Sequence, residues 1–157
     1  MQTEERFVEL MERYKRVIYK VCYVYAPPGQ IEDYFQETVL ALWRSYRLFR
    51  GECSHSTWIY RVALHTCISF VRRRMRRPVC VPLAVELSAD DDSESREQLE
   101  ELYALISRLG RLDRAVVLLW LEECSYEEIA RITGLTRQNV GVRLTRIREK
   151  LRMMTNG

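Results

Sequence analysis

The sequence contains few residues that interrupt helices. Only four prolines and six glycines occur among its 157 residues, and no segment shows sustained alternation of apolar and polar residues. Proline and glycine destabilise helix interiors, whereas alternation with a period of two is typical of a half-buried strand. Their scarcity favours an all-α fold, and the length allows one medium domain or two small ones.

Long apolar runs are also lacking. The longest strongly apolar run, AVVLLWL at residues 115–121, is far shorter than the roughly 20 residues that span a bilayer. The N-terminus, MQTEERFVEL, has no apolar segment of the kind found in signal peptides. We therefore expect a cytoplasmic protein without membrane insertion, and a buried helix at 115–121.

The sequence is poor in the residues that build catalytic and metal sites. It has two histidines and five cysteines, with no C-x-x-C pair and no glycine-rich phosphate loop. An odd number of cysteines, several on apolar helical faces, suits a reducing compartment. Cys53, His55, His65 and Cys67 resemble two ligand pairs, but residues 65 and 67 point about 200° apart on a helix and cannot easily share a metal. We expect no enzyme activity, no metal and no cofactor.

The net charge of +3 conceals an uneven distribution. Residues 52–77 contain six arginines and one glutamate, and residues 137–152 contain five arginines and one lysine against one glutamate. Between them, residues 84–101 contain eight acidic residues and one arginine. Two basic segments separated by an acidic one predict two contacts with a polyanion. The alternative for either segment alone is an ordinary solvated helix face.

Apolar residues recur at three- and four-residue steps through most of the chain, which predicts amphipathic helices. An acidic, serine-rich stretch without this period predicts a flexible linker at 78–98. The sequence thus predicts two small helical domains, 1–77 and 99–157. The expected helices cover about 4–25, 31–49, 56 or 57 to 74, 95–109 and 112–123, followed by two more.

Residues 125–152 have the local signals of a helix-turn-helix. Ser125 and Glu128 form an S-x-x-E capping box, in which each side chain accepts the other residue's free backbone N–H. Gly134 then ends the first helix, Thr136 caps the second, and the small Ala130 lets the two helices approach closely. In such a motif the second helix enters the DNA major groove. The alternative is an ordinary helical hairpin with an exposed basic face.

The second helix of this motif has an apolar and a polar face. Val140, Leu144, Ile147 and Leu151 recur at steps of four, three and four, so they should face inward. Glycine inside a helix costs about 1 kcal/mol relative to alanine, yet Gly141 would let the backbone approach the groove or a phosphate; the alternative is a neutral accident. The outward face comprises Arg137, Gln138, Gly141, Val142, Thr145 and Arg148, flanked by Arg143, Arg146 and Lys150.

Residues 57–77, TWIYRVALHTCISFVRRRMRR, combine aromatic residues with a cationic end. Ring faces and phosphate-binding cations together are typical of sites for single-stranded nucleic acid. Trp58 and Phe70 also lie on or beside the inward stripe, so core packing explains each aromatic residue taken alone. The arginines could likewise complement the dipole at a helix end.

Three segments together resemble the extracytoplasmic-function bacterial sigma factors of the compact, two-domain kind. Residues 31–46, IEDYFQETVLALWRSY, are similar to the region 2 helix that docks on RNA polymerase. Residues 49–77 are similar to the promoter-melting segment, and residues 104–152 are similar to region 4. The segments occur in the family's order and together cover nearly the whole chain.

The resemblance implies a transcription initiation factor for which polymerase performs the chemistry. An anti-sigma factor would be its usual regulator, and region 4 would also touch the β flap of polymerase. Contacts with the β′ clamp helices would involve Asp33, Gln36, Glu37 and Trp43. Contacts with the melted minus-ten element would involve Arg50, Ser54, His55, Trp58, Arg61, His65, Arg72 and Arg73. Contacts with the double-stranded minus-thirty-five element would involve Thr136, Arg137, Gln138, Gly141, Arg143, Thr145 and Arg146.

Departures from the family pattern concern the DNA contacts. The family often has Asn at the position of His65 and Asp at that of Ser69, and some members have a basic residue at the position of Gly141. Base preferences therefore cannot be carried over from the family. One alternative is a stand-alone helix-turn-helix regulator, whose helix at 31–46 would bind a second copy or form part of a sensor. Another is a helical adaptor whose basic faces bind acidic proteins.

Overall fold

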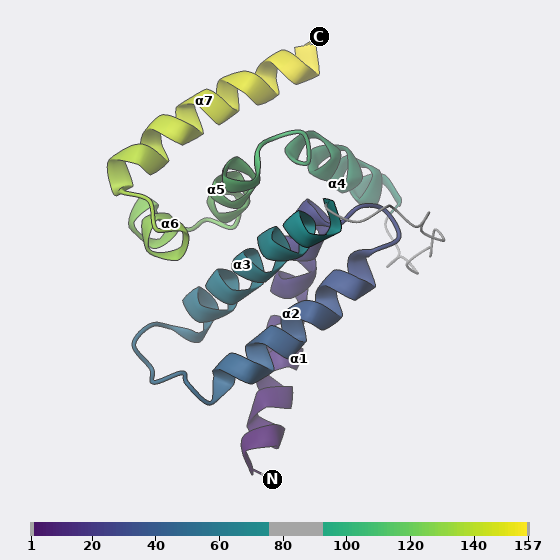
Figure 1. The fold of residues 1–157 in the computed structure, drawn as a ribbon. Helices are drawn as coiled ribbons and strands as arrows, with labels where there is room; N and C mark the ends of the chain where they lie inside the picture. Colours follow the sequence, from purple (N-terminus) through teal and green to yellow (C-terminus); the bar gives the residue numbers. More distant parts are fainter. Residues whose placement is uncertain (1, 76–92, 157) are drawn as a thin grey trace. The chain divides into compact units, whose positions relative to one another are not determined.

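The structure, a computed structural model, describes residues 2–75 and 93–156. These residues form seven α-helices and no strand, which confirms the all-α fold. The chain divides into two compact units, Met1–Ala84 and Val85–Gly157 (Figure 1). Most of the linker predicted at 78–98 lies outside the described residues, as do Arg76 and Arg77 of the first basic segment. Within the described ranges, no helix has the length and apolar character needed to cross a membrane.

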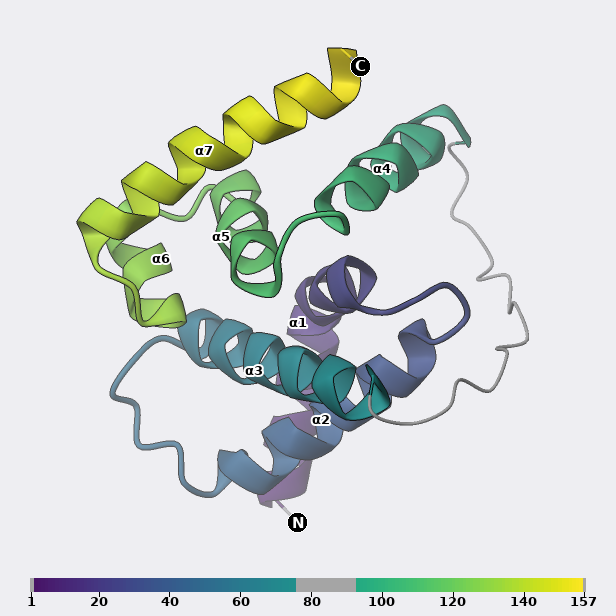
Figure 2. The ribbon, with the colours of Figure 1, turned by 45° about the horizontal axis from the view of Figure 1, so that its top comes forward.

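The first unit is a bundle of three helices. α1 (Gln2–Tyr25), α2 (Ile31–Tyr46) and α3 (His55–Met75) each pack against the other two (Figures 1 and 2). The bundle forms because apolar residues recur on one side of each helix and can be removed from water together. The most deeply buried apolar residues are Ile18, Val21, Cys22, Val24, Tyr34, Leu42, Ile59, Ala63 and Cys67.

The C-terminal end of α2 differs from the prediction. The helix ends at Tyr46 rather than near residue 49, and the N–H groups of Leu48 and Phe49 donate to carbonyls only three residues back. Leu48 N–H donates to Ser45 O at 3.0 Å and Phe49 N–H donates to Tyr46 O at 3.2 Å. These tighter turns carry Phe49 out of the helix and against Trp58, with ring centroids 5.0 Å apart.

The start of α3 is set by a side-chain cap. The Ser54 hydroxyl oxygen accepts the Thr57 N–H at 3.1 Å, so the helix begins at His55, slightly earlier than predicted. A hydroxyl at this position satisfies one of the backbone donors that the first turn leaves without a helical acceptor.

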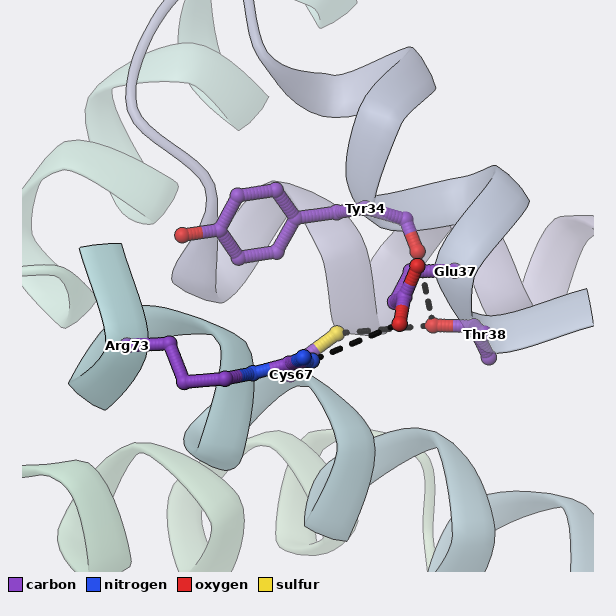
Figure 3. A network of polar contacts seen from close by, with 5 residues as sticks. All are labelled: Tyr34, Glu37, Thr38, Cys67 and Arg73. Carbon is purple, nitrogen blue, oxygen red and sulfur yellow. Dashed lines mark hydrogen bonds and ion pairs between the residues drawn. The ribbon is translucent and has the colours of Figure 1, made fainter. Parts of the chain in front are cut away.

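A small polar cluster lies inside the core of the first unit. The buried Thr38 hydroxyl donates to the Tyr34 carbonyl at 2.8 Å and lies 3.7 Å from the Cys67 sulfur (Figure 3). Hydrogen bonding to Cys67, followed by burial, raises the pKa of the Cys22 thiol far above its usual value. The Cys22 thiol therefore stays protonated, and both buried cysteines pack as small apolar groups.

The second unit contains four helices. α4 (Ser93–Ile106), α5 (Arg111–Leu121) and α6 (Tyr126–Thr133) all pack against α7 (Arg137–Asn156), and α5 also packs against α6. α4 and α5 end two or three residues before their predicted ends, and α4 begins inside the predicted linker. The apolar run at 115–121 lies in α5, as predicted. The core consists of Ile106, Leu109, Ala115, Val116, Val117, Leu118, Leu119, Ile129, Ile132, Val140, Leu144 and Ile147.

The start of α6 follows the capping signal with one difference. The Ser125 hydroxyl oxygen accepts the Glu128 N–H at 3.1 Å, as predicted. The Glu128 carboxylate, however, accepts the Ser125 hydroxyl proton at 3.2 Å, where the predicted box has it accept the Ser125 backbone N–H. The serine thus caps the helix, and the glutamate holds the serine side chain in place.

The turn between α6 and α7 has the predicted geometry. Gly134 adopts the left-handed conformation, with φ of 82°, and its N–H donates to the Ala130 carbonyl at 2.9 Å. The Thr136 hydroxyl oxygen accepts the Asn139 N–H at 3.1 Å and so caps α7. Both helix ends therefore have their backbone groups satisfied close to where the chain reverses.

Replacing either of two glycines of this motif by alanine should change the free energy of unfolding, but in opposite directions. Gly134 has a positive φ, so Gly134→Ala should lower the free energy of unfolding by about 1 kcal/mol. Gly141 lies inside α7 without a positive φ, and an added Cβ would meet its nearest neighbour at 3.5 Å, an ordinary contact. Gly141→Ala should therefore raise the free energy of unfolding by up to about 1 kcal/mol. Urea unfolding of the two full-length variants measures both changes, and shifts of the same sign would contradict this account.

Candidate nucleic-acid and docking interfaces

One face of α2 points away from the core of the first unit. Asp33 and Gln36 are exposed on it, and so is Leu40, which keeps 48% of its surface in contact with water. Steps of three and four place the three residues on one side of the helix. A large exposed apolar side chain flanked by polar ones is typical of a protein-docking surface. The sequence prediction missed Leu40. Its signal was its position two residues before the inward Leu42, which places it on nearly the opposite side of the helix.

The other two predicted docking residues lie differently. The ring of Trp43 packs edge-on against Phe7 of α1, with centroids 4.9 Å apart, because position 43 is in phase with the inward stripe. Glu37 is half-buried at the edge of the face. The structure therefore places Asp33 and Gln36 on the outer face of α2, while Trp43 mainly joins α2 to α1.

Glu37 forms an ion pair with Arg73 of α3. Glu37 Oε1 lies 3.3 Å from Arg73 Nη2 (Figure 3). The Arg73 guanidinium also lies 5.4 Å from the centre of the Phe70 ring. The sequence prediction had placed these two charged residues in separate interfaces, one for polymerase and one for DNA. Because the Arg73 side chain is mostly exposed, the pair contributes at most about 1 kcal/mol to stability. It orients the guanidinium without preventing its exchange onto a phosphate.

The exposed side of α3 carries a row of predicted DNA contacts. Arg61, His65 and Arg72 are all exposed, and steps of four and seven place them on one face of the helix. This arrangement suits binding along a phosphate backbone. His65 is exposed whereas Cys67 is buried, which agrees with the argument that these two residues cannot share a metal.

The loop before α3 is supported by aromatic rings. Trp58 is only 8% exposed and lies between Tyr46 and Phe49, with centroid distances of 6.0 and 5.0 Å. Phe49 in turn lies 5.2 Å from the His55 ring. The indole of Trp58 is therefore occupied with supporting the loop, as core packing of this residue predicted.

Side chains are exposed both in this loop and at the first residue of α3. Arg50 and His55 are exposed, as expected of residues that meet DNA, whereas the Ser54 hydroxyl serves as the cap of α3. Leu48 is 75% exposed and did not figure in the sequence prediction. Its signal was an apolar residue out of phase with the inward stripe of α2, immediately before the polar loop.

In α7, two of the predicted DNA-binding arginines pair with acidic residues of neighbouring helices. Arg143 Nη1 lies 2.8 Å from Asp113 Oδ1 of α5, in a partly buried pair. Arg137 Nη1 lies 3.4 Å from Glu127 Oε1 of α6, in an exposed pair. The Arg143 side chain therefore reaches from α7 to α5. The more exposed pair leaves Arg137 free to exchange its partner for a phosphate.

The other polar residues predicted on the outward face of α7 are exposed, and some of them also contact other groups of the second unit. Gln138, Thr145 and Arg146 are exposed. The Thr145 hydroxyl donates to the Gly141 carbonyl one turn earlier at 3.0 Å. Arg148 is exposed, as predicted, and its guanidinium lies over the ring of Trp120 in α5, 5.1 Å from the ring centre.

Gly141 has a neighbour that the sequence did not reveal. A Cβ atom added to Gly141 would lie 3.5 Å from Cε2 and 3.9 Å from Cδ2 of Tyr126, the first residue of α6. The prediction placed this bare position on the open outward face. In the structure it lies beneath a tyrosine ring.

Comparisons with known proteins match both units of the chain. Residues 10–77 match the family model for Sigma-70 region 2, and residues 99–151 match that for Sigma-70, region 4. The ECF RNA polymerase sigma-E factor of Escherichia coli (strain K12) is 28% identical, over 94% of this chain and 85% of that protein. The sigma-E factor of Haemophilus influenzae is 29% identical, over 94% and 86%.

Solved structures show the same fold. CnrH, in complex with the cytosolic domain of CnrY, has a TM-score of 0.72 at 21% identity, over 98% of this chain and 89% of that one. The sigma factor RpoE of Bartonella quintana, in complex with the anti-sigma factor NepR, has a TM-score of 0.77 at 18% identity, over 97% and 98%. With two sigma-70 regions in order along a pair of helical units, this chain belongs to the extracytoplasmic-function sigma factors and is a transcription initiation factor.

Proposed function

We propose that this sigma factor docks on the β′ clamp helices of core RNA polymerase through the outer face of α2. The exposed Leu40 between polar residues of that face carries the proposal. Burying an apolar side chain against a partner helix is favourable because it removes apolar surface from water. In the free protein this surface stays in contact with water, so the exposed leucine has no stabilising role there. Asp33 and Gln36 would supply the polar contacts that orient the docked complex.

The promoter contacts follow from the two basic helices. α3, with Arg61, His65 and Arg72 in one row, would follow the backbone of the melted minus-ten strand. α7 would enter the major groove of the minus-thirty-five element, with its N-terminal residues toward the bases. Region 4 would in addition meet the β flap. Polymerase would perform all the chemistry, so the chain would act as a targeting factor and not as an enzyme. Its proposed location is the cytoplasm.

An anti-sigma factor is the proposed regulator. Two proteins of the same fold were solved with partners, RpoE with the anti-sigma factor NepR and CnrH with the cytosolic domain of CnrY. A regulator that covers the outer face of α2 would compete with polymerase for Leu40. We also propose the domain limits 1–77 and 99–157, with residues 78–98 as the linker, since both family matches lie inside these limits or extend just to them.

The direct test of this function is transcription in vitro. Core RNA polymerase should initiate at specific sites on a library of promoter fragments only when the full-length chain is present. Run-off products that are identical with and without the chain would contradict the proposal. A chain that binds DNA as a dimer without recruiting polymerase would instead fit the stand-alone regulator.

The α2 face provides a second test. Leu40→Asp should weaken binding to core RNA polymerase by about tenfold or more, because a charged group would replace the central apolar anchor. Val8→Asp is the matched control, since it places the same charge at an exposed apolar position of α1. Fluorescence anisotropy of labelled protein titrated with core polymerase gives both affinities. Equal weakening by the two variants, or no weakening by Leu40→Asp, would contradict docking through α2.

The minus-ten contact predicts a difference between two neighbouring arginines. Arg72→Gln should reduce the salt dependence of holoenzyme binding to a single-stranded minus-ten oligonucleotide by roughly 0.7 in the logarithmic slope, the value for one lost phosphate contact. Arg73→Gln should change the slope less, because its guanidinium can reach a phosphate only by giving up the pair with Glu37. Binding measured at several salt concentrations gives both slopes. An unchanged slope in Arg72→Gln would remove this residue from the DNA interface.

A further inference from the structure

The space above Gly141 is occupied by a side chain of a different helix. The Tyr126 ring lies within 4 Å of the place where a Cβ would be attached to Gly141. Tyr126 is the first residue of α6, and 37% of its surface stays exposed. The ring is therefore packed on α7 and open to solvent at the same time.

The ring lies within the row of residues that α7 presents to DNA under the proposed function. Arg137, Gly141 and Thr145 are four residues apart and so share one side of the helix. Arg137 and Thr145 are both exposed. The ring of Tyr126 thus takes the place that a side chain at position 141 would have in the middle of this row.

The first turn of α6 contacts α7 at a second point. Glu127, next to Tyr126, forms the ion pair with Arg137 at 3.4 Å. Two consecutive residues of α6 therefore meet two consecutive turns of α7 on the same side. In helix-turn-helix proteins the first helix crosses the DNA backbone while the second enters the groove. Tyr126 lies at the start of the first helix and packs on the second. It is therefore close to both the helix that crosses the DNA backbone and the helix that enters the groove.

We propose that position 141 acts on minus-thirty-five recognition through Tyr126. Tyr126 is a DNA-contacting residue, and Gly141 is the positioning residue whose missing side chain gives the ring its place. The inference rests on the proposed function, because it takes α7 as the helix that enters the major groove. It differs from the simpler explanation that the bare backbone of Gly141 itself approaches the groove.

Side-chain size at position 141 separates the two explanations. An alanine Cβ would meet Tyr126 at 3.5 Å, an ordinary van der Waals distance, so the ring can stay. A leucine would require the space that the ring occupies and would displace it. In a protein that lacks the ring, leucine at 141 would have nothing to displace. Direct approach of the backbone to DNA, in contrast, would make leucine harmful whether or not the ring is present.

The experiment is a double-mutant cycle in holoenzyme. Wild-type holoenzyme first selects its preferred promoter from a library randomised in the minus-thirty-five element. Double-stranded fragments of that promoter are then the probe for Gly141→Ala, Gly141→Leu, Tyr126→Ala, Tyr126→Phe and the double variant Gly141→Leu/Tyr126→Ala. Each variant is measured for promoter affinity and for base preference across the library. Thermal unfolding and affinity for core polymerase show that each variant is folded and assembled.

Tyr126→Ala and Gly141→Leu should each weaken promoter binding by about tenfold, the size of one protein–DNA contact. The double variant should bind no more weakly than Tyr126→Ala alone, since both changes remove the same contact. Gly141→Ala should bind like the wild type. Tyr126→Phe retains the ring, so it should keep the wild-type base preference. Tyr126→Ala should change that preference, which a loss of stability alone would not do.

Two results would overturn the inference. One is wild-type affinity and base preference in Tyr126→Ala, which would show that the ring does not contact DNA. The other is an additional tenfold loss on adding Gly141→Leu to Tyr126→Ala, which would show that position 141 meets DNA directly. Failure of the proposed function has a different result, because wild-type holoenzyme would then select no promoter at all and the inference would lose its basis.

Discussion

Three buried side chains decide which side of α7 faces the core and which side faces outward. Val140, Leu144 and Ile147 are almost completely removed from water within the core that α5 and α6 share with α7. Burying three such residues contributes several kcal/mol, roughly 1.5–3 for each side chain, which far exceeds any single surface contact of the helix. Once these residues face inward, the side chains available to DNA are decided. α2 follows the same rule in the first unit, where the buried Tyr34 and Leu42 leave Leu40 outside.

Around these cores, cations that were expected to meet DNA already have partners within the chain. Arg73 pairs with Glu37, Arg137 with Glu127 and Arg143 with Asp113. Exposed pairs of this kind contribute little to stability, because water screens them and two long side chains must be held still. Their main consequence is orientation, since a guanidinium held at one end of a helix can transfer to a phosphate with little rearrangement. The partly buried Arg143 pair is the exception, and it joins α7 to α5.

The local features of the fold were predictable because their causes lie within a few residues of each other. The cap at Ser125, the left-handed turn at Gly134 and the cap at Thr136 all occur as expected. Helix ends were less predictable. α2 stops at Tyr46, and the turns that follow bring Phe49 against Trp58, which lies on the next helix and whose position depends on how the bundle closes. A helical period continues through such a position, so the period alone cannot show where the helix ends.

The sequence by itself determined the all-α class, the inward stripes and the order of two sigma regions, since each depends on periodicity, caps or motif spacing. Only the tertiary structure decided which side chains of separate helices meet. Gly141 lies beneath Tyr126 and Arg73 reaches Glu37 because of the angles at which the helices cross. Those angles result from the packing of the whole core, and residues 15 or 36 positions apart share no local signal. For this reason the sequence shows that position 141 lacks a side chain, whereas only the fold shows which side chain takes its place.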